Sequence, residues 1–164
     1  MSPVLASPRL RPLPSRRTTA GRASYSLDVV LLSVVDGQLA AALVRVDGRS
    51  ASRSRERWTL PWEGGVADEP LAMAAERVAR DVMGTSPQYL EQVGAFGDGR
   101  RHPGPAPLSV AFVGLVPAGM VLPADSGAEF FLVSDLPPIA PRQRAMIEGA
   151  VTHVQQRRAS RHRG

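Results

Sequence analysis

The 164-residue sequence contains no cysteine, which excludes disulfides, thiolate metal sites and a cysteine nucleophile. It also contains no lysine, so all 20 of its basic residues are arginines. The longest apolar run, Val29–Val35, is far shorter than the roughly 20 residues that a membrane-spanning helix needs. The first two dozen residues are broken by prolines and have no apolar segment before a cleavage site, unlike a secretory signal. We therefore expect a cytoplasmic protein without a membrane segment.

The net charge of +5 comes from the two ends of the chain. Residues 1–23 hold five arginines and residues 157–164 hold four, and neither segment contains an acidic residue. The rest of the chain has 11 arginines against 15 acidic residues. Aromatic side chains are not interleaved with the terminal arginines, which favours solvated, disordered ends over a nucleic-acid site. A weak, nonspecific contact of these ends with nucleic acid or an anionic surface stays open.

Composition and length predict one globular domain. Hydrophobic residues make up 43% of the chain and charged residues 21%, which is ordinary for such a domain. Residues 1–23 are rich in proline, arginine and serine and cannot bury enough apolar surface to offset the entropy of ordering. We predict a disordered basic arm over 1–23, a domain over 24–156 and a basic tail over 157–164.

Hydrophobic patterning predicts a strand-rich α/β domain. The β-branched segment from Tyr25 ends at Asp36-Gly37, a strong hairpin turn. From Pro70 to Met83, apolar residues recur at helical spacing and Gly84 follows as a stop signal. We expect strands over 25–35, 38–46, 58–60, 88–99, 108–118 and 128–136, and helices over 70–83 and 141–156. Two helices can cover the two faces of one sheet, so a mixed α/β/α sandwich is the economical arrangement.

The segment from Trp58 to Thr85 carries a motif. Trp58, Leu60 and Pro61 lead into a turn, after which Glu69, Arg77 and Gly84 follow at fixed spacing. This segment resembles the Nudix box, G-x5-E-x7-R-E-U-x-E-E-x-G-U, in which U is a bulky apolar residue. Five further segments are similar to Nudix domains of NAD-metabolism regulators and of ADP-ribose-type pyrophosphohydrolases: 89–92, 96–98, 109–111, 115–117 and 134–138. The resemblance covers residues 25–155 and implies the Nudix α/β/α sandwich, with a mixed, curved sheet between helices.

The sequence departs from the family at the residues that decide catalysis. In active members, three glutamates of the box helix bind Mg²⁺ or Mn²⁺, because hard divalent cations need several oxygen ligands and activate the attacking water. Those three positions, which share one helix face, are Val78, Asp81 and Val82 here. The glycine pair that usually follows the proline is also displaced, since Trp62-Glu63 stands there. The box is therefore degenerate, and we expect altered turn geometry with weak or no hydrolysis.

Each candidate residue has a functional and a plainer interpretation. If activity persists, the resemblance assigns catalysis to Glu69, Arg77 and Asp81, with Mg²⁺ or Mn²⁺ on Asp81. Alternatively, Glu69 caps the helix or pairs with Arg77, Arg77 forms a structural ion pair, and Asp81 is a surface acid. Glu76 is interpreted as a solvated helix charge.

The resemblance also implies ligand-binding positions after the box. Phe96, Asp98 and Arg101 correspond to places where related domains approach a nucleotide, and an aromatic ring with an arginine suits base stacking and pyrophosphate binding. A plain strand end and loop explains them equally well. His102, His153 and His162 lack partners at ligand spacing, so neither zinc nor histidine-based catalysis is proposed, and Ser109 is read as an ordinary strand serine.

Three functions stay open. The leading hypothesis is a Nudix-fold pseudoenzyme that binds a nucleoside-diphosphate-type ligand such as ADP-ribose, or a partner. The alternative is a divergent metal-dependent pyrophosphohydrolase that combines Asp81 with Glu63, Glu69 or an acid from another loop. The third is association with nucleic acid through the arginine-rich ends. A homodimer is compatible with each of them.

Overall fold

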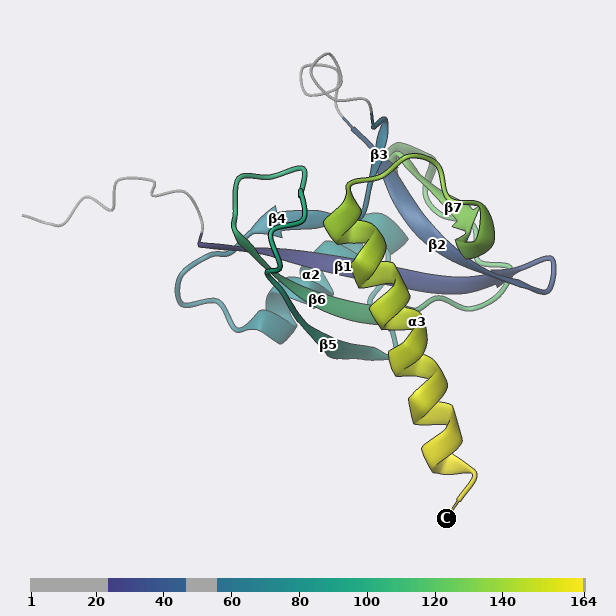
Figure 1. Cartoon of the computed structure of the whole chain (residues 1–164). Coiled ribbons are helices and arrows are strands. Elements are labelled where there is room, and N and C mark those ends of the chain that lie inside the picture. Colours follow the sequence, from purple (N-terminus) through teal and green to yellow (C-terminus); the bar gives the residue numbers. More distant parts are fainter. Residues whose placement is uncertain (1–23, 47–55, 164) are drawn as a thin grey trace, which may run out of the picture.

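The structure, a computed structural model, describes residues 24–46 and 56–163. The predicted arm over 1–23 and most of the polar loop before Trp58 lie outside the described residues. The described part contains one mixed sheet and two long helices (Figure 1). None of its helices is both long enough and apolar enough to cross a lipid bilayer.

Seven strands form the sheet in the described residues, and five of them follow the order β3-β2-β1-β6-β5. β4 pairs with the start of β1, and β7 pairs with β2. Only the central pair, β1 with β6, is parallel among these described pairs, so the sheet is mixed. The strands are β1 (Tyr25–Val35), β2 (Gln38–Arg45), β3 (Trp58–Thr59), β4 (Trp62–Gly64), β5 (Leu90–Phe96), β6 (Leu108–Leu115) and β7 (Ala128–Leu132).

One helix covers each face of the sheet (Figure 1). The helices are α2 (Leu71–Met83) and α3 (Pro141–Arg161), with short 3-10 turns η1 (Ala124–Ser126) and η2 (Val133–Asp135). Because side chains alternate along a strand, β1 contributes to both cores. Leu27 and Leu31 pack with α2, whereas Val30 and Leu32 pack with α3. This confirms the predicted α/β/α sandwich around a mixed sheet.

The β1–β2 hairpin confirms its predicted turn. Asp36 and Gly37 have φ angles of +49° and +75°, and Val35 pairs with Gln38 across the two-residue connection. Positive φ at both central residues defines the turn type whose twist matches that of paired strands.

Several element boundaries differ from the predicted ones; β5 spans Leu90–Phe96 instead of 88–99, and β6 ends at Leu115 instead of residue 118. α3 continues to Arg161 instead of ending near Gln156, because no glycine or proline stands between these two residues and residues 155–159 include good helix formers. The last strand ends at Leu132, where η2 begins. Residues 62–64, interpreted as part of a turn, form β4 against β1.

Candidate functional site

A cleft of about 370 Å³ lies between α2 and the strands that face it. It is lined by Val44, Arg45, Val46, Thr59, Leu60, Pro61, Trp62, Glu63, Val78, Asp81 and Val82. Three of these residues, Val78, Asp81 and Val82, stand at the box positions where the resemblance expects metal-binding glutamates. The cleft volume falls near the lower end of the roughly 300–1,000 Å³ range of small-molecule sites.

Helix α2 presents these residues because its apolar stripe fixes its rotation on the sheet. Its buried residues are Ala74, Ala75, Val78, Ala79, Val82 and Met83. The helix ends at Gly84, whose φ of +75° is the left-handed conformation that favours glycine and whose N–H bonds the Arg80 carbonyl at 2.8 Å. Among the described residues, no side chain caps the start of α2, so the capping alternative for Glu69 is wrong.

Arg77 binds two carboxylates on the side of this helix. Its Nη1 donates to Glu63 Oε2 at 2.7 Å, and its Nη2 donates to Glu69 Oε1 at 2.8 Å and also to Glu63 Oε1. The two-pronged bond to Glu63, followed by the bond to Glu69, raises the pKa of Arg77 further above its already high ordinary value. The prediction that Arg77 forms an ion pair with Glu69 is confirmed, and Glu63 is an additional partner.

Asp81 takes no part in these ion pairs. It is exposed and makes no hydrogen bond or ion pair within the described ranges, 24–46 and 56–163. Its neighbours Val78 and Val82, which are 7% and 5% exposed, offer no ligand atoms. In the part of the chain that the structure describes, no group of three His, Cys, Asp or Glu residues could hold a metal ion. The donors present in this cleft therefore do not fit Mg²⁺ or Mn²⁺, which need several oxygens.

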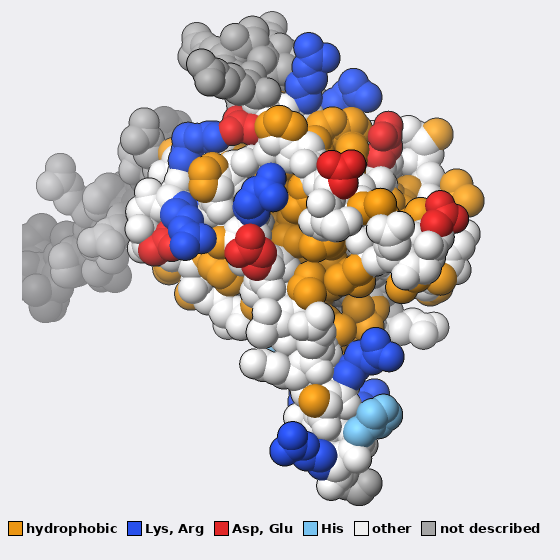
Figure 2. Space-filling view, turned by 45° about the vertical axis from the view of Figure 1, so that its right-hand side comes forward, with side chains coloured by type: hydrophobic (Ala, Val, Ile, Leu, Met, Phe, Trp, Pro, Cys, Tyr) orange, Lys and Arg blue, Asp and Glu red, His pale blue; other side chains and the backbone are white. Residues whose placement is uncertain are grey.

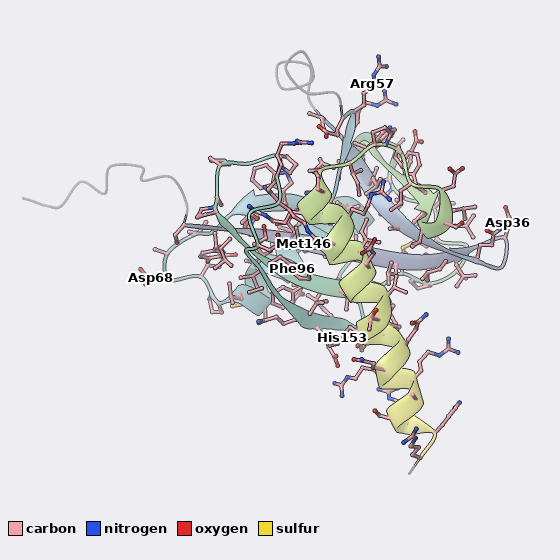
Figure 3. The ribbon with its side chains drawn as sticks, in the orientation of Figure 1. Asp36, Arg57, Asp68, Phe96, Met146 and His153 are labelled. Carbon is pink, nitrogen blue, oxygen red and sulfur yellow. The ribbon has the colours of Figure 1, made fainter. Side chains whose placement is uncertain are left out.

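The structure does not bring Phe96, Asp98 and Arg101 together in one site. Phe96 belongs to the core under α3, close to Gly149, and lies near Met146 in Figure 3. Asp98 pairs with Arg100 at 2.9 Å on the surface, and Arg101 pairs with Glu56. None of the three lines the cleft against α2.

A cluster of polar side chains is buried on the opposite face of the sheet, and the sequence analysis missed it. At its centre, the Asp28 carboxylate is fully buried and accepts three hydrogen bonds. Ser26 Oγ donates to Oδ1 at 2.6 Å, and Gln143 Nε2 donates to Oδ2 at 3.0 Å. The third donor is His102 Nε2, at 2.7 Å from Oδ2. The amide N–H of Gly104 donates to His102 Nδ1 at 2.9 Å, so the proton of the neutral ring lies on Nε2.

The same cluster holds a buried cation. Arg142, 5% exposed, donates through Nη1 to the Ala106 carbonyl at 2.7 Å and to Ser109 Oγ at 3.3 Å. Ser109 Oγ lies 2.6 Å from Ser26 Oγ, so two hydroxyls connect the guanidinium to the Asp28 carboxylate. These contacts tie β1, β6, the loop over residues 100–107 and the first turn of α3 together. We call these residues (Ser26, Asp28, His102, Ser109, Arg142 and Gln143) the Asp28 cluster.

Ser109 lies in β6, as the sequence analysis expected, and His102 lies in the loop between β5 and β6; the sequence analysis did not foresee their burial. Both side chains are buried and hydrogen-bonded. One signal in the sequence pointed to this cluster: Asp28 stands within an otherwise apolar strand, and a buried carboxylate requires partners.

Trp62 closes this cluster towards the loop. Its ring meets that of His102 edge-on, with centroids 4.9 Å apart, and a Cβ added at Gly104 would lie 2.5 Å from the indole. Trp62 pairs with Asp28 across β1 and β4, which puts both side chains on the α3 face. Trp62 contributes to the wall of the cleft, while its ring packs on the far side.

A second ionic group joins β5 to α3. Glu91 Oε2 is 2.7 Å from His153 Nε2 and accepts a hydrogen bond from Arg157 Nε at 3.0 Å. Figure 3 shows His153 on the part of α3 near the end of the sheet. The bonds from Arg157 and then from His153 lower the pKa of Glu91 to about 2. Burial raises the pKa of the adjacent Tyr89. His153, which the sequence analysis excluded only as a zinc ligand or catalytic residue, thus contacts the Glu91 carboxylate.

Comparison with known proteins places the fold in a class. No protein-family model matches the chain, and no curated protein matches it in sequence. Solved structures do match: NrtR of Shewanella oneidensis complexed with a 27mer DNA has 22% identity and a TM-score of 0.61, over 80% of this chain and 62% of that one. The Nudix domain of that NrtR, complexed with ADP-ribose, has 20% identity and a TM-score of 0.59, over 79% and 87%. A MutT/Nudix protein from Listeria innocua has 19% identity and a TM-score of 0.64, over 83% and 96%.

The fold is therefore an α/β/α sandwich of the type shared by these proteins. More particularly, the chain has the Nudix fold, as its resemblance predicted. It spans about 62% of the length of NrtR in the DNA complex and most of the isolated Nudix domain.

Proposed function

We propose that this chain is a Nudix-fold binding module whose cleft against α2 holds a nucleotide-type ligand and hydrolyses it weakly or not at all. One observation carries the proposal: Val78 and Val82 line the cleft at two of the three positions where the box helix would supply metal-binding glutamates. The third position keeps only Asp81.

The nearby carboxylates are already engaged. Glu63 and Glu69 both bond to Arg77, so recruiting either for a metal would take one of its two carboxylate partners from the guanidinium. Arg77 cannot lose its proton to compensate. A lone aspartate gives a hard divalent cation too few oxygens to bind tightly or to activate water.

Two observations support a nucleotide-type ligand. The Nudix domain of NrtR, which matches over 79% of this chain, was crystallised with ADP-ribose. The cleft of about 370 Å³ is a concave space with apolar walls and a few polar groups, as small-molecule sites have.

A hydrolysis panel tests the absence of catalysis. ADP-ribose, NADH, dinucleoside polyphosphates and nucleoside triphosphates are incubated with the full chain in Mg²⁺ or Mn²⁺. We expect no turnover above background. Turnover above about 1 s⁻¹ that disappears in Asp81→Ala would favour the metal-dependent pyrophosphohydrolase and overturn the proposal. Thermal stabilisation by the same compounds, with and without metal, tests binding, because any ligand of the folded state raises its stability.

A second candidate function is contact with nucleic acid through the end of α3. This part of the helix projects beyond the sheet, and residues 155–163 are exposed (Figure 1). It carries Arg157, Arg158 and Arg161 without an acidic residue, and Figure 2 shows basic side chains around its tip. NrtR, a fold neighbour, was crystallised with DNA. Binding of duplex DNA that weakens steeply with salt and is lost in Arg158→Gln/Arg161→Gln would support this function, and binding unaffected by these changes would refute it.

A further inference from the structure

We propose that the cleft against α2 holds the nucleoside end of its ligand without a divalent cation, and that the diphosphate contributes little to binding. Asp81 is the residue that recognises the ribose hydroxyls. This inference rests on the proposed function and specifies which part of the ligand the site recognises.

The charges around the cleft disfavour a diphosphate. Two carboxylates, Glu63 and Asp81, and one guanidinium, Arg45, belong to its lining. Arg77 adds a positive charge and Glu69 a negative one, since both join the ion pairs of Glu63. Among the described residues, these three carboxylates against two guanidiniums leave a net charge of −1. Without a metal ion, a diphosphate placed against α2 would meet a potential of its own sign.

Arg45, the guanidinium in the lining of this cleft, is also directed away from α2. Arg45 is exposed, and its guanidinium carbon lies 4.9 Å from the ring centroid of Trp58. Arg45 pairs with Trp58 across β2 and β3, and Trp58 packs with the core on the α3 face. The neighbouring Val44 instead packs with the core on the α2 face. Arg45 is therefore suited to a phosphate that points out of the cleft and unsuited to one lodged on the helix.

The surface that replaces the glutamates is apolar. Val78 and Val82 belong to the core on the α2 face, and Val44 packs against them from β2. Val46 lines the cleft as well. Such a surface offers nothing to an anion, and it can cover the flat apolar face of a base at a favourable free energy for each square ångström removed from water.

Asp81 supplies the polar contact. It lies three residues after Val78 and one before Val82, so the three share a helix face. No hydrogen bond or salt bridge of Asp81 occurs among residues 24–46 and 56–163, and its exposed carboxylate is ready to accept. Two carboxylate oxygens match the two hydroxyl donors of a ribose, a pairing that nucleotide-binding folds use for the 2′-hydroxyl. Asp81, in this arrangement, selects a ribonucleoside over its 2′-deoxy form.

The experiment measures binding to the full chain by calorimetry in EDTA. The probes are the four ribonucleosides, their 2′-deoxy forms, their 5′-diphosphates, ADP-ribose and inorganic pyrophosphate. We expect at least one ribonucleoside to have a Kd within about threefold of that of its own diphosphate. The same ribonucleoside should bind at least tenfold more tightly than its 2′-deoxy form. Pyrophosphate should not bind. Asp81→Ala should abolish the preference for ribose, whereas Asp125→Ala, which removes an exposed aspartate of η1, should preserve it.

The outcomes separate this inference from the proposed function. Diphosphates or ADP-ribose that bind at least tenfold more tightly than every nucleoside, or that bind only when Mg²⁺ is added, would refute the nucleoside assignment while the binding module stands. A ribose preference that survives Asp81→Ala would refute the role of Asp81. Absence of binding by every probe, with and without Mg²⁺, would overturn both.

Discussion

Replacing Asp28 by alanine should destabilise the fold strongly, although Asp28 does not line the cleft. Its carboxylate accepts from Ser26 at 2.6 Å, from His102 at 2.7 Å and from Gln143 at 3.0 Å, and it is fully buried. Asp28→Ala leaves these three buried donors without their acceptor. Each buried donor left unsatisfied costs about 1–3 kcal/mol, so the loss should reach about 3–5 kcal/mol. That is a large part of the roughly 5–15 kcal/mol that stabilises a typical domain.

Thermal unfolding followed by circular dichroism measures the effect. At about 4 °C per kcal/mol for a domain of this size, the melting temperature should fall by roughly 12–20 °C. Asp98→Ala is the matched control, because it removes an aspartate whose ion pair with Arg100 is about half exposed on both sides. Such a surface pair is worth at most about 1 kcal/mol. Ser26→Ala, which removes one hydrogen-bonding hydroxyl, should fall between the two, at about 1–3 kcal/mol.

The reasoning has a clear point of failure. If Asp28→Ala unfolds at nearly the same temperature as Asp98→Ala, the Asp28 cluster does not hold the sheet, the loop and α3 together. If Asp28→Ala does not fold at all, urea unfolding of Ser26→Ala still gives the contribution of one member of the cluster.

Three further predictions concern the cleft, an ionic contact and a helix end. Mn²⁺ should stabilise the double variant Val78→Glu/Val82→Glu but neither the wild type nor the control Val78→Gln/Val82→Gln. In EDTA the glutamate variant should lose about 2 kcal/mol or more of folding free energy, because both positions are buried. Equal Mn²⁺ responses in all three proteins would contradict the argument that the present cleft does not fit a metal ion. The pKa of Glu91 is lowered to about 2, so its contribution to stability is present above its ordinary value of 4.5 and is lost as pH falls from there towards 2. In Glu91→Gln, the free energy of unfolding measured with urea should therefore change less with pH between 4.5 and about 2 than in the wild type. An unchanged pH profile would count against the contact of Glu91 with Arg157 and His153. Gly84→Ala should lower the free energy of unfolding by about 1–2 kcal/mol, and by more than Gly37→Ala does. Both glycines have a φ of +75°, but only at Gly84 would the added Cβ crowd a neighbouring proline, at 3.0 Å. Calorimetric melting compares the two variants, and equal losses of stability would mean that only backbone strain matters.

Local patterns were sufficient to predict most of the architecture. The β1–β2 hairpin follows from the two apolar runs on either side of Asp36-Gly37, and α2 follows from apolar residues at helical spacing. Each of these signals lies within a dozen or so neighbouring residues. β4 escaped prediction because it is three residues long and exists through its pairing with the start of β1. The end of α3 was missed because nothing in the sequence after Gln156 marks a stop.

The Asp28 cluster could not be assembled from local signals. Its members come from two strands, a loop and α3, with up to 115 positions between the partners Asp28 and Gln143. The sequence reveals that a buried aspartate needs donors but does not reveal which side chains supply them. His102 gave no local sign of burial, since prolines and glycine surround it. Its position depends on how the loop over residues 100–107 returns to the sheet.

Trp62 and Glu63 stand where the Nudix box usually has its glycine pair, and the pleat of β4 places one of them on each face of the sheet. Trp62 pairs with Asp28 and Glu63 pairs with Leu27, so adjacent side chains point to opposite sides of the sheet. The indole therefore covers His102, while the carboxylate reaches Arg77 on α2. A slip of one residue would exchange them, leaving a carboxylate against the closed Asp28 cluster and an indole against Arg77. Such a slip would bury a carboxylate beside a cluster whose donors are already used, and it would take one carboxylate from Arg77. The residues at 62 and 63 thus fit one register, and that register keeps Glu63 bound to Arg77.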